Sequence, residues 1–121
     1  MPSSIKRIDT TARMSHIVVH RDVAYFAGAI AKNLSGDIHS QVRETLEDIE
    51  TSLAKIGSDK SRILSAQIWL KDVTRDFSAM NETWEQWIPK GAAPARATGQ
   101  VEMTSPDILV EIIITAAAGE A

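Results

Sequence analysis

The chain has 121 residues, and none of them is cysteine. No disulfide bond, thiolate nucleophile or thiolate metal site is therefore available to it. It also lacks an apolar run of the ~20 residues that a membrane-spanning helix needs, because Glu111 interrupts its longest apolar stretch. The N-terminal sequence MPSSIKRIDT is polar and has no signal-peptide core. These absences predict a cytoplasmic protein with no membrane segment.

A concentrated basic surface and a set of metal ligands are missing as well. The 13 basic and 16 acidic residues give a formal net charge of -3, and no basic cluster is denser than Lys6-Arg7. Nucleic-acid-binding surfaces normally show a basic stripe with interleaved aromatic residues, so nucleic acid is not expected as a partner. His16 and His20 share an expected strand, but a metal site needs three or four converging ligands. We therefore expect no metal.

Two segments show the apolar spacing of amphipathic helices. The first begins after Asp37, a suitable N-cap, and ends at Gly57. Its apolar stripe consists of Ile38, Val42, Leu46, Ile49, Leu53 and Ile56. The second runs from about residue 76 to 88 and is stopped by Pro89. Its expected core stripe consists of Phe77, Met80, Trp84 and Trp87.

Six segments are typical of β-strands: residues 5–8, 16–20, 23–27, 63–71, 96–104 and 107–116. A turn at Arg21-Asp22 joins the second and third, and a turn at Ser105-Pro106 joins the last two. In the fourth strand, one side is expected to carry Leu64, Ala66, Ile68 and Leu70. The order of elements predicts one domain over residues 1–121, an α/β fold of the α+β sandwich type with two helices packed on one sheet.

The last predicted strand is apolar on both of its sides. Ile108, Val110, Ile112 and Ile114 alternate with Leu109, Glu111 and Ile113. Two helices can cover only one face of a sheet, so the second apolar face requires another cover. A second copy of the chain is the economical cover, and we therefore expect a homo-oligomer.

Two charged residues lie in these last strands, although unpaired ions are seldom buried. Period-two geometry places Glu111 on the face that we assign to the subunit interface. If Arg96 and the polar residues that alternate with it face the same interface, Arg96 and Glu111 line one shallow cavity there. Two structural interpretations stand beside this hypothesis: an Arg–Glu ion pair across the interface, or a carboxylate held by backbone donors.

Several motifs, taken together and in order, resemble the RidA/YjgF family of reactive intermediate deaminases. They are YFAGAIA after the second strand, the helix QVRETLEDIETSLAKIGSD, LKDVTRDFSAMNETWEQW, PARAT and ILVEIIITAA. The resemblance implies a chorismate-mutase-like fold with one mixed β-sheet, and a homotrimer with sites in the clefts between subunits. It also implies hydrolysis of 2-imino acids and their enamine tautomers, such as 2-aminoacrylate, to 2-keto acids and ammonia, without a cofactor.

The resemblance also assigns site residues. The carboxylate-binding arginine of the family falls on Arg96, and its water-positioning glutamate falls on Glu111. Asn81 and Gly28 match the asparagine and glycine of the family's substrate-binding site. A guanidinium can hold a substrate carboxylate through two parallel hydrogen bonds, and a carboxylate can orient a water molecule and accept its proton.

The chain differs from the family pattern at four positions. Ala27 and Ala29 stand where a serine and a glutamine are common, Thr98 replaces a cysteine, and His16 lies near the position of a tyrosine. A second hypothesis is therefore a trimer that binds small carboxylates such as keto acids without turnover. A third is the ribonuclease or translation-inhibitor role attached to some relatives, which the acidic charge balance disfavours.

Overall fold

A mixed six-stranded β-sheet forms the frame of the protein in the computed structural model, which describes residues 4–119. Its strands are β1 (Ile5–Thr10), β2 (Ser15–His20), β3 (Val23–Phe26), β4 (Ile63–Leu70), β5 (Ala95–Gln100) and β6 (Val110–Ala117). They lie in the order β1-β2-β3-β6-β4-β5, and every neighbouring pair is antiparallel except β4 and β5. The predicted order of strands and helices along the chain is confirmed, with a short 3₁₀ turn, η1 (Lys60–Arg62), before β4.

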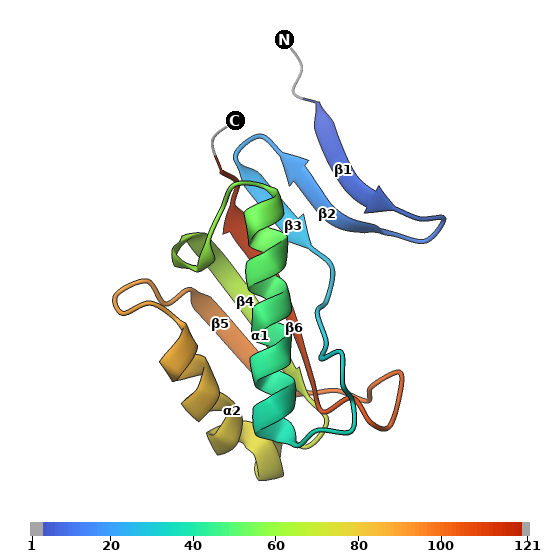
Figure 1. Cartoon of the computed structure of the whole chain (residues 1–121), viewed down its shortest axis with the longest axis vertical. Coiled ribbons are helices and arrows are strands. Elements are labelled where there is room, and N and C mark those ends of the chain that lie inside the picture. Colours follow the sequence, from blue (N-terminus) through green and yellow to red (C-terminus); the bar gives the residue numbers. More distant parts are fainter. Residues whose placement is uncertain (1–3, 120–121) are drawn as a thin grey trace.

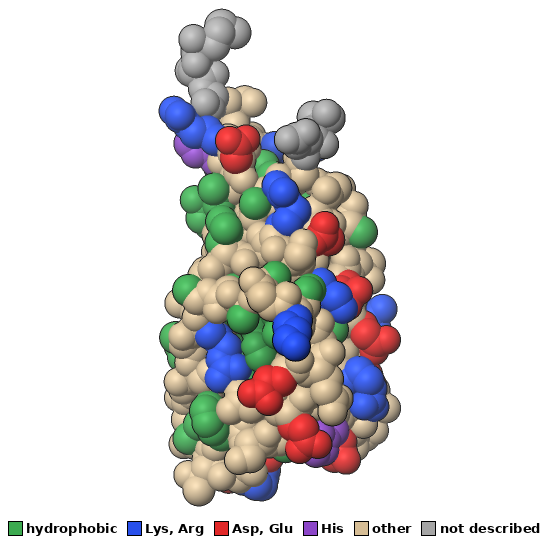
Figure 2. All heavy atoms as spheres, turned by 90° about the vertical axis from the view of Figure 1, so that its left-hand side faces the viewer, with side chains coloured by type: hydrophobic (Ala, Val, Ile, Leu, Met, Phe, Trp, Pro, Cys, Tyr) green, Lys and Arg blue, Asp and Glu red, His purple; other side chains and the backbone are tan. Residues whose placement is uncertain are grey.

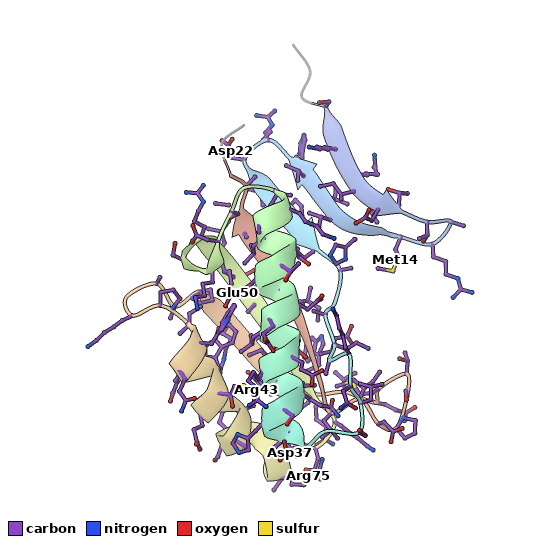
Figure 3. The ribbon with its side chains drawn as sticks, in the orientation of Figure 1. Met14, Asp22, Asp37, Arg43, Glu50 and Arg75 are labelled. Carbon is purple, nitrogen blue, oxygen red and sulfur yellow. The ribbon has the colours of Figure 1, made fainter. Side chains whose placement is uncertain are left out.

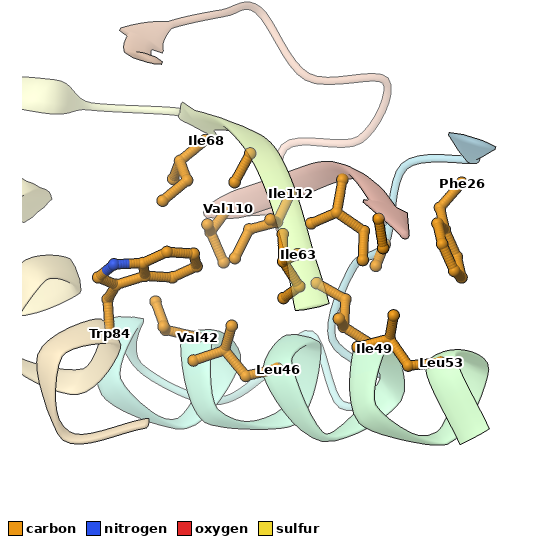
Figure 4. Close-up of a cluster of buried hydrophobic side chains, with 14 of the residues drawn as sticks. Phe26, Val42, Leu46, Ile49, Leu53, Ile63, Ile68, Trp84, Val110 and Ile112 are labelled. Carbon is orange, nitrogen blue, oxygen red and sulfur yellow. The ribbon is translucent and has the colours of Figure 1, made fainter. Parts of the chain in front are cut away.

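Two helices, α1 (Ile38–Lys55) and α2 (Val73–Trp87), pack on one face of this sheet (Figure 1). Their apolar residues meet the inward-facing residues of β4 and β6 in one core cluster, which includes Trp84 of α2 (Figure 4). The predicted sandwich of two helices on one sheet is confirmed. Within residues 4–119, neither helix combines the length and apolar character that crossing a bilayer would demand.

Helix α1 has both of its predicted ends. The carboxylate of Asp37, at the start of α1 in Figure 3, accepts a 2.9 Å hydrogen bond from the backbone N–H of Ser40. Gly57 follows the helix with φ 69°, a left-handed conformation that glycine adopts without steric cost. The predicted apolar stripe is buried except at its two ends, where Ile38 and Ile56 are half-buried.

Gln41 of α1 connects two irregular segments through a single buried amide. Its Nε2 lies 3.2 Å from the carbonyl oxygens of Leu34 and Gly36, and 2.9 Å from that of Asp107. Its Oε1 accepts a 3.0 Å hydrogen bond from the backbone N–H of Leu109. The segment before α1 and the segment before β6 are therefore fixed to the same side chain.

The hairpin predicted around the Arg21-Asp22 turn is present between β2 and β3. Arg21 takes a left-handed φ of 59° to close it. Figure 3 labels Met14 and Asp22 at the turns that lead into and out of β2.

Helix α2 departs from its predicted pattern. It begins earlier than expected because the carboxylate of Asp72 caps it, accepting a 3.0 Å hydrogen bond from the N–H of Arg75. Phe77 was expected in the core stripe but is 42% exposed. The buried positions follow a spacing of four residues, so Asp76 rather than Phe77 precedes Met80 in the stripe. The charge of the buried Asp76 carboxylate is paired with Arg75 at 2.9 Å.

The alternation predicted for β4 is wrong at its first residues. Ile63 is buried, whereas Leu64 is 49% exposed. The cause is a bulge between Ile63 and Ser65, which inserts one extra residue opposite β6. From Ala66 onward, the buried positions are those predicted.

The last two strands do not form the hairpin that the sequence suggested. Strand β4 lies between them, with β5 parallel to it and β6 antiparallel to it. A parallel pair needs a long crossover connection, and α2 supplies it. Residues 101–109 form an irregular connection, so β5 ends before the predicted residue 104 and β6 begins after the predicted residue 107.

Strand β6 separates the two faces of the sheet. Val110, Ile112, Ile114 and Ala116 are buried beneath the helices, whereas the residues between them are half-buried on the other side. No helix within residues 4–119 covers this second face, as predicted. We call it the open face, and cross-strand register places on it Tyr25, Gln67, Trp69, Glu111, Ile113 and Thr115.

Candidate functional site

Glu111 lies on the open face with its carboxylate against Gly28. A Cβ atom at Gly28 would overlap Oε2 of Glu111, so only glycine leaves room for this side chain in its present position. The backbone of the next residue holds Gly28 in place, because Ala29 and Ile112 exchange hydrogen bonds of 2.9 and 3.0 Å. The glycine that the family resemblance singled out therefore touches the glutamate.

No backbone donor among residues 4–119 holds the Glu111 carboxylate, so that structural interpretation is not supported, whereas an ion pair across an interface stays a prediction. Among residues 4–119, its carboxylate forms no ion pair and accepts no hydrogen bond. It is half-buried, with Trp69 directly opposite on β4. The carboxylate is thus available to a ligand or to a second copy of the chain.

Arg96 lies on the other face of the sheet, so the condition for a cavity shared with Glu111, that both face the same side of the sheet, is not met within one chain. Arg96 is in register with Ala66, whose buried side chain faces the helices. Its guanidinium carbon lies 5.8 Å from the ring centroid of Trp84, a cation–π distance. The condition fails because β5 and β6 are not neighbours, since β5 is the edge strand beyond β4.

The environment of Arg96 is only partly solvated. Partial burial lowers the pKa of its guanidinium, and the negative charge of Glu85 opposes this effect. Arginine stays protonated despite such a shift. Among the described residues, Arg96 forms no ion pair, so its charge is available to an anion.

Thr98 and Asn81 lie on the Arg96 side of the sheet. Thr98 shares its face of β5 with Arg96, in register with the buried Ile68. Its Oγ1 is buried and has no hydrogen-bond partner among residues 4–119, an arrangement that calls for a bound group or water. Asn81 is half-buried on α2, one turn before Trp84.

Ala27 lies beside the Glu111–Gly28 contact, whereas the ring of His16 reaches the helix side of the sheet. Ala27 precedes Gly28 and donates its backbone N–H to the carbonyl of His16 at 2.9 Å. The imidazole Nε2 of His16 is 2.9 Å from the hydroxyl of Ser52 on α1. The ring of His16 is therefore engaged with a helix. No three His, Asp or Glu side chains within residues 4–119 converge on a metal-binding point.

The site residues thus form two groups in one chain. The glutamate group consists of Glu111, Gly28 and Ala27, and the arginine group consists of Arg96, Thr98 and Asn81. The ring of His16 is hydrogen-bonded to α1 and belongs to neither group. Sequence reasoning overlooked Trp69, which belongs to the glutamate group. The alternation of β4 was the available signal, because it places Trp69 opposite the buried Ile68 and Leu70, on the face without helices.

Solved structures of the YjgF family have this same fold, in which two helices pack on one face of a mixed six-stranded sheet. The family profile described as Endoribonuclease L-PSP matches residues 4–118. The chain therefore belongs to this family, the YjgF/RidA family.

Three relatives match over nearly their whole length. The RutC family protein YoaB of Escherichia coli (strain K12) is 44% identical over 114 residues, which are 94% of this chain and 98% of YoaB. NMB1025, a YjgF-family protein from Neisseria meningitidis, is 34% identical and superimposes with a TM-score of 0.91 over 98% of both chains. An uncharacterized protein from Pseudomonas aeruginosa is 36% identical with a TM-score of 0.91, covering 95% of this chain and 99% of its own.

Proposed function

We propose that the protein is a cofactor-free hydrolytic deaminase of 2-imino acids and their enamine tautomers, such as 2-aminoacrylate. Its products would be 2-keto acids and ammonia. The observation that carries this proposal is the pair of unengaged charges, the Glu111 carboxylate against Gly28 and the Arg96 guanidinium on Trp84. Family membership favours the same chemistry.

The two groups complete one site only if two copies of the chain contribute to it. Within a chain they lie on opposite faces of the sheet, but β5 is an edge strand, so its Arg96 can border an adjacent subunit. The open face of each copy needs a cover, and a homotrimer would supply it. In this arrangement, Arg96 of one subunit faces Glu111 of the next.

The residue types fit the proposed reaction. Arg96 would hold the substrate carboxylate through two parallel hydrogen bonds and so orient the adjacent C=N bond. Glu111 would orient a water molecule and accept its proton as the water oxygen bonds to the imine carbon. The C–N bond of the resulting carbinolamine then breaks, which releases ammonia and leaves the keto acid. A protonated imine is already electrophilic, so the reaction requires neither a metal nor an organic cofactor.

Binding without turnover is the second candidate function. Ala27 offers no side-chain hydroxyl, and the imidazole of His16 is hydrogen-bonded to Ser52, so these positions present few polar groups to a substrate. Arg96 and the unpartnered Thr98 hydroxyl would still suffice to bind a small carboxylate.

A nucleic-acid substrate is less compatible with the surface. The net charge is -3, and the face in Figure 2 mixes acidic and basic side chains without forming a basic stripe. Phosphate-binding surfaces depend on concentrated positive charge.

The first experiment measures turnover. An amino acid oxidase generates imino acids in situ, and the release of keto acid is followed with and without the protein. Faster keto-acid release supports the deaminase. An unchanged rate, together with keto-acid binding by calorimetry, would establish the binding-only function instead.

A complementation experiment tests whether the site is shared. Arg96→Ala and Glu111→Gln are each expected to be inactive alone. If they are unfolded together and refolded as mixed trimers, about a quarter of the interfaces regain both wild-type residues. Activity should return to about that fraction of the wild-type value. Mixed trimers without recovered activity would show that the two residues do not act across an interface.

A further inference from the structure

Four residues form a row across the open face, and glycine stands at both ends of the row. Trp69 of β4 is in register with Glu111 of β6 on one side and with Gly99 of β5 on the other. Gly28 borders Glu111 at the far end. Directly opposed residues on one sheet face have neighbouring side chains. The carboxylate and the indole are therefore adjacent.

Each glycine accommodates one of the two large side chains. A Cβ atom at Gly99 would lie 3.1 Å from Cζ3 and 3.5 Å from Cε3 of Trp69, so the six-membered ring of the indole extends over Gly99. The Glu111 carboxylate is turned the other way, toward Gly28. The approach to Glu111 is thus bounded by backbone at Gly28 on one side and by the indole on the other.

From this row we propose that Trp69 determines which imine side chains the enzyme accepts, an inference that rests on the proposed deaminase function. The carboxylate of the substrate belongs at Arg96, and its imine carbon must lie near the water held by Glu111. The remaining substituent on that carbon then lies along the apolar surface beside Glu111, which is the indole. The other neighbour on β4, Gln67, is polar and exposed.

A large ring in this place leaves room for a small aliphatic substituent and excludes an aromatic one. The preferred substrates of the wild-type protein are therefore imino acids with short side chains, derived from amino acids such as alanine. Imino acids derived from leucine and phenylalanine should be processed progressively less well.

Two substitutions change the space beside Glu111 in opposite directions. Trp69→Ala removes the indole and enlarges that space. Gly99→Ala pushes the indole from β5 toward Glu111 and reduces it, because a Cβ at 3.1 Å requires the ring to shift. The readout is the ratio of kcat/KM for the phenylalanine-derived imino acid to that for the alanine-derived one. Trp69→Ala should raise this ratio about 10-fold or more, since filling or emptying an apolar pocket changes specificity on that scale. Gly99→Ala should lower the ratio, and Trp69→Phe should fall between the wild type and Trp69→Ala.

The matched control is Gln67→Ala, which truncates another open-face side chain of β4 and should leave the ratio unchanged. Light scattering on every variant separates a change in specificity from a loss of assembly. If the wild type processes imino acids but Trp69→Ala and Gly99→Ala both keep its ratio, the role of Trp69 is refuted and the deaminase stands. If the wild type hydrolyses no imino acid, the proposed function fails, and the inference about Trp69 fails with it.

Discussion

The Glu111 carboxylate occupies the space that a Cβ atom would fill at residue 28, so the glycine at this position sets where the carboxylate can lie. The strand around Glu111 is apolar, and the space beside it exists because residue 28 has no Cβ. The absence of an ion pair or hydrogen bond within residues 4–119 leaves its lone pairs for water or substrate. A residue in this state contributes little to the stability of the isolated chain, so its chemical role can be tested separately.

Glu111→Gln should retain fold and assembly but lose about 10²–10⁴-fold in turnover, because an amide cannot accept the proton of the attacking water. Keto-acid binding should persist. If Glu111 is instead half of an ion pair across the interface, the loss appears as about 3–5 kcal/mol of stability. A thermal melt and an imine-hydrolysis assay on the same variant distinguish the two roles. A lower melting temperature with an unchanged rate per folded protein would exclude catalysis.

Arg96→Ala should weaken the binding of 2-keto carboxylates about 30- to 100-fold, as expected for the loss of a charge-assisted bidentate contact. Calorimetry measures this directly, and circular dichroism checks the fold. Arg96→Lys is the matched control: a point charge should recover only part of the affinity. Wild-type affinity in Arg96→Ala would assign the guanidinium to packing on Trp84.

Among the elements, α1 has a pH-sensitive start. The hydrogen bonds from the backbone and side chain of Ser40 lower the pKa of Asp37 below its ordinary value of 3.8. A lowered folded-state pKa stabilises the protein above the unfolded value, and this stabilisation disappears as the pH falls through the folded value. Asp37→Ala should therefore lower Tm by roughly a few degrees at neutral pH, and the difference should shrink below about pH 4.

Asp37→Asn is the control for that measurement, because asparagine also caps helices but does not titrate. It should melt close to the wild type at neutral pH. An Asp37→Ala variant whose deficit is the same at pH 3 and pH 7 would contradict the assignment.

The elements also show how far the sequence determines the fold. Apolar spacing located both helices and six strands, since periodicity reports which residues face a core. It placed Phe77 wrongly because the buried positions of α2 follow a spacing of four residues through Asp76, Met80 and Trp84, and Leu64 wrongly because a bulge shifts the register. Local sequence patterns do not fix the start of a capped helix to within one turn, and they do not reveal an inserted residue in a strand.

The sequence supplied the candidate site residues but not how they are arranged. Motif resemblance named Glu111 and Arg96, and the Gly28–Glu111 contact agrees with it. The face that Arg96 occupies depends on β4 lying between β5 and β6. The expected turn at Ser105-Pro106 suggested instead that β5 and β6 pair directly. Trp69 was overlooked for a related reason: its partners Glu111 and Gly99 lie on strands distant in sequence.

For the whole molecule, the open face predicts self-association. Light scattering at micromolar concentration should give a mass of about 40 kDa, three times the 13.2 kDa of one chain. The half-buried side chains of Ile113 and Thr115 would be covered in that assembly. Ile113→Lys should shift the mass toward the monomer. Glu47→Lys, which introduces lysine at an exposed residue of α1, should leave the mass unchanged. A monomer mass for the wild type would refute the trimer and the shared site.

The four hydrogen bonds of the Gln41 amide, which we call the Gln41 clamp, should slow the opening of the irregular connection before β6. The N–H of Leu109 is donated to a fully buried amide oxygen, so its proton can exchange with solvent only when the clamp opens. In deuterium exchange, Leu109 should be protected like the amides of the core strands. The amide of exposed Thr104 in the same connection should exchange within seconds. Gln41→Leu should abolish this difference. The end of the irregular connection of residues 101–109, at Leu109, would then open only when the packing around α1 opens as well.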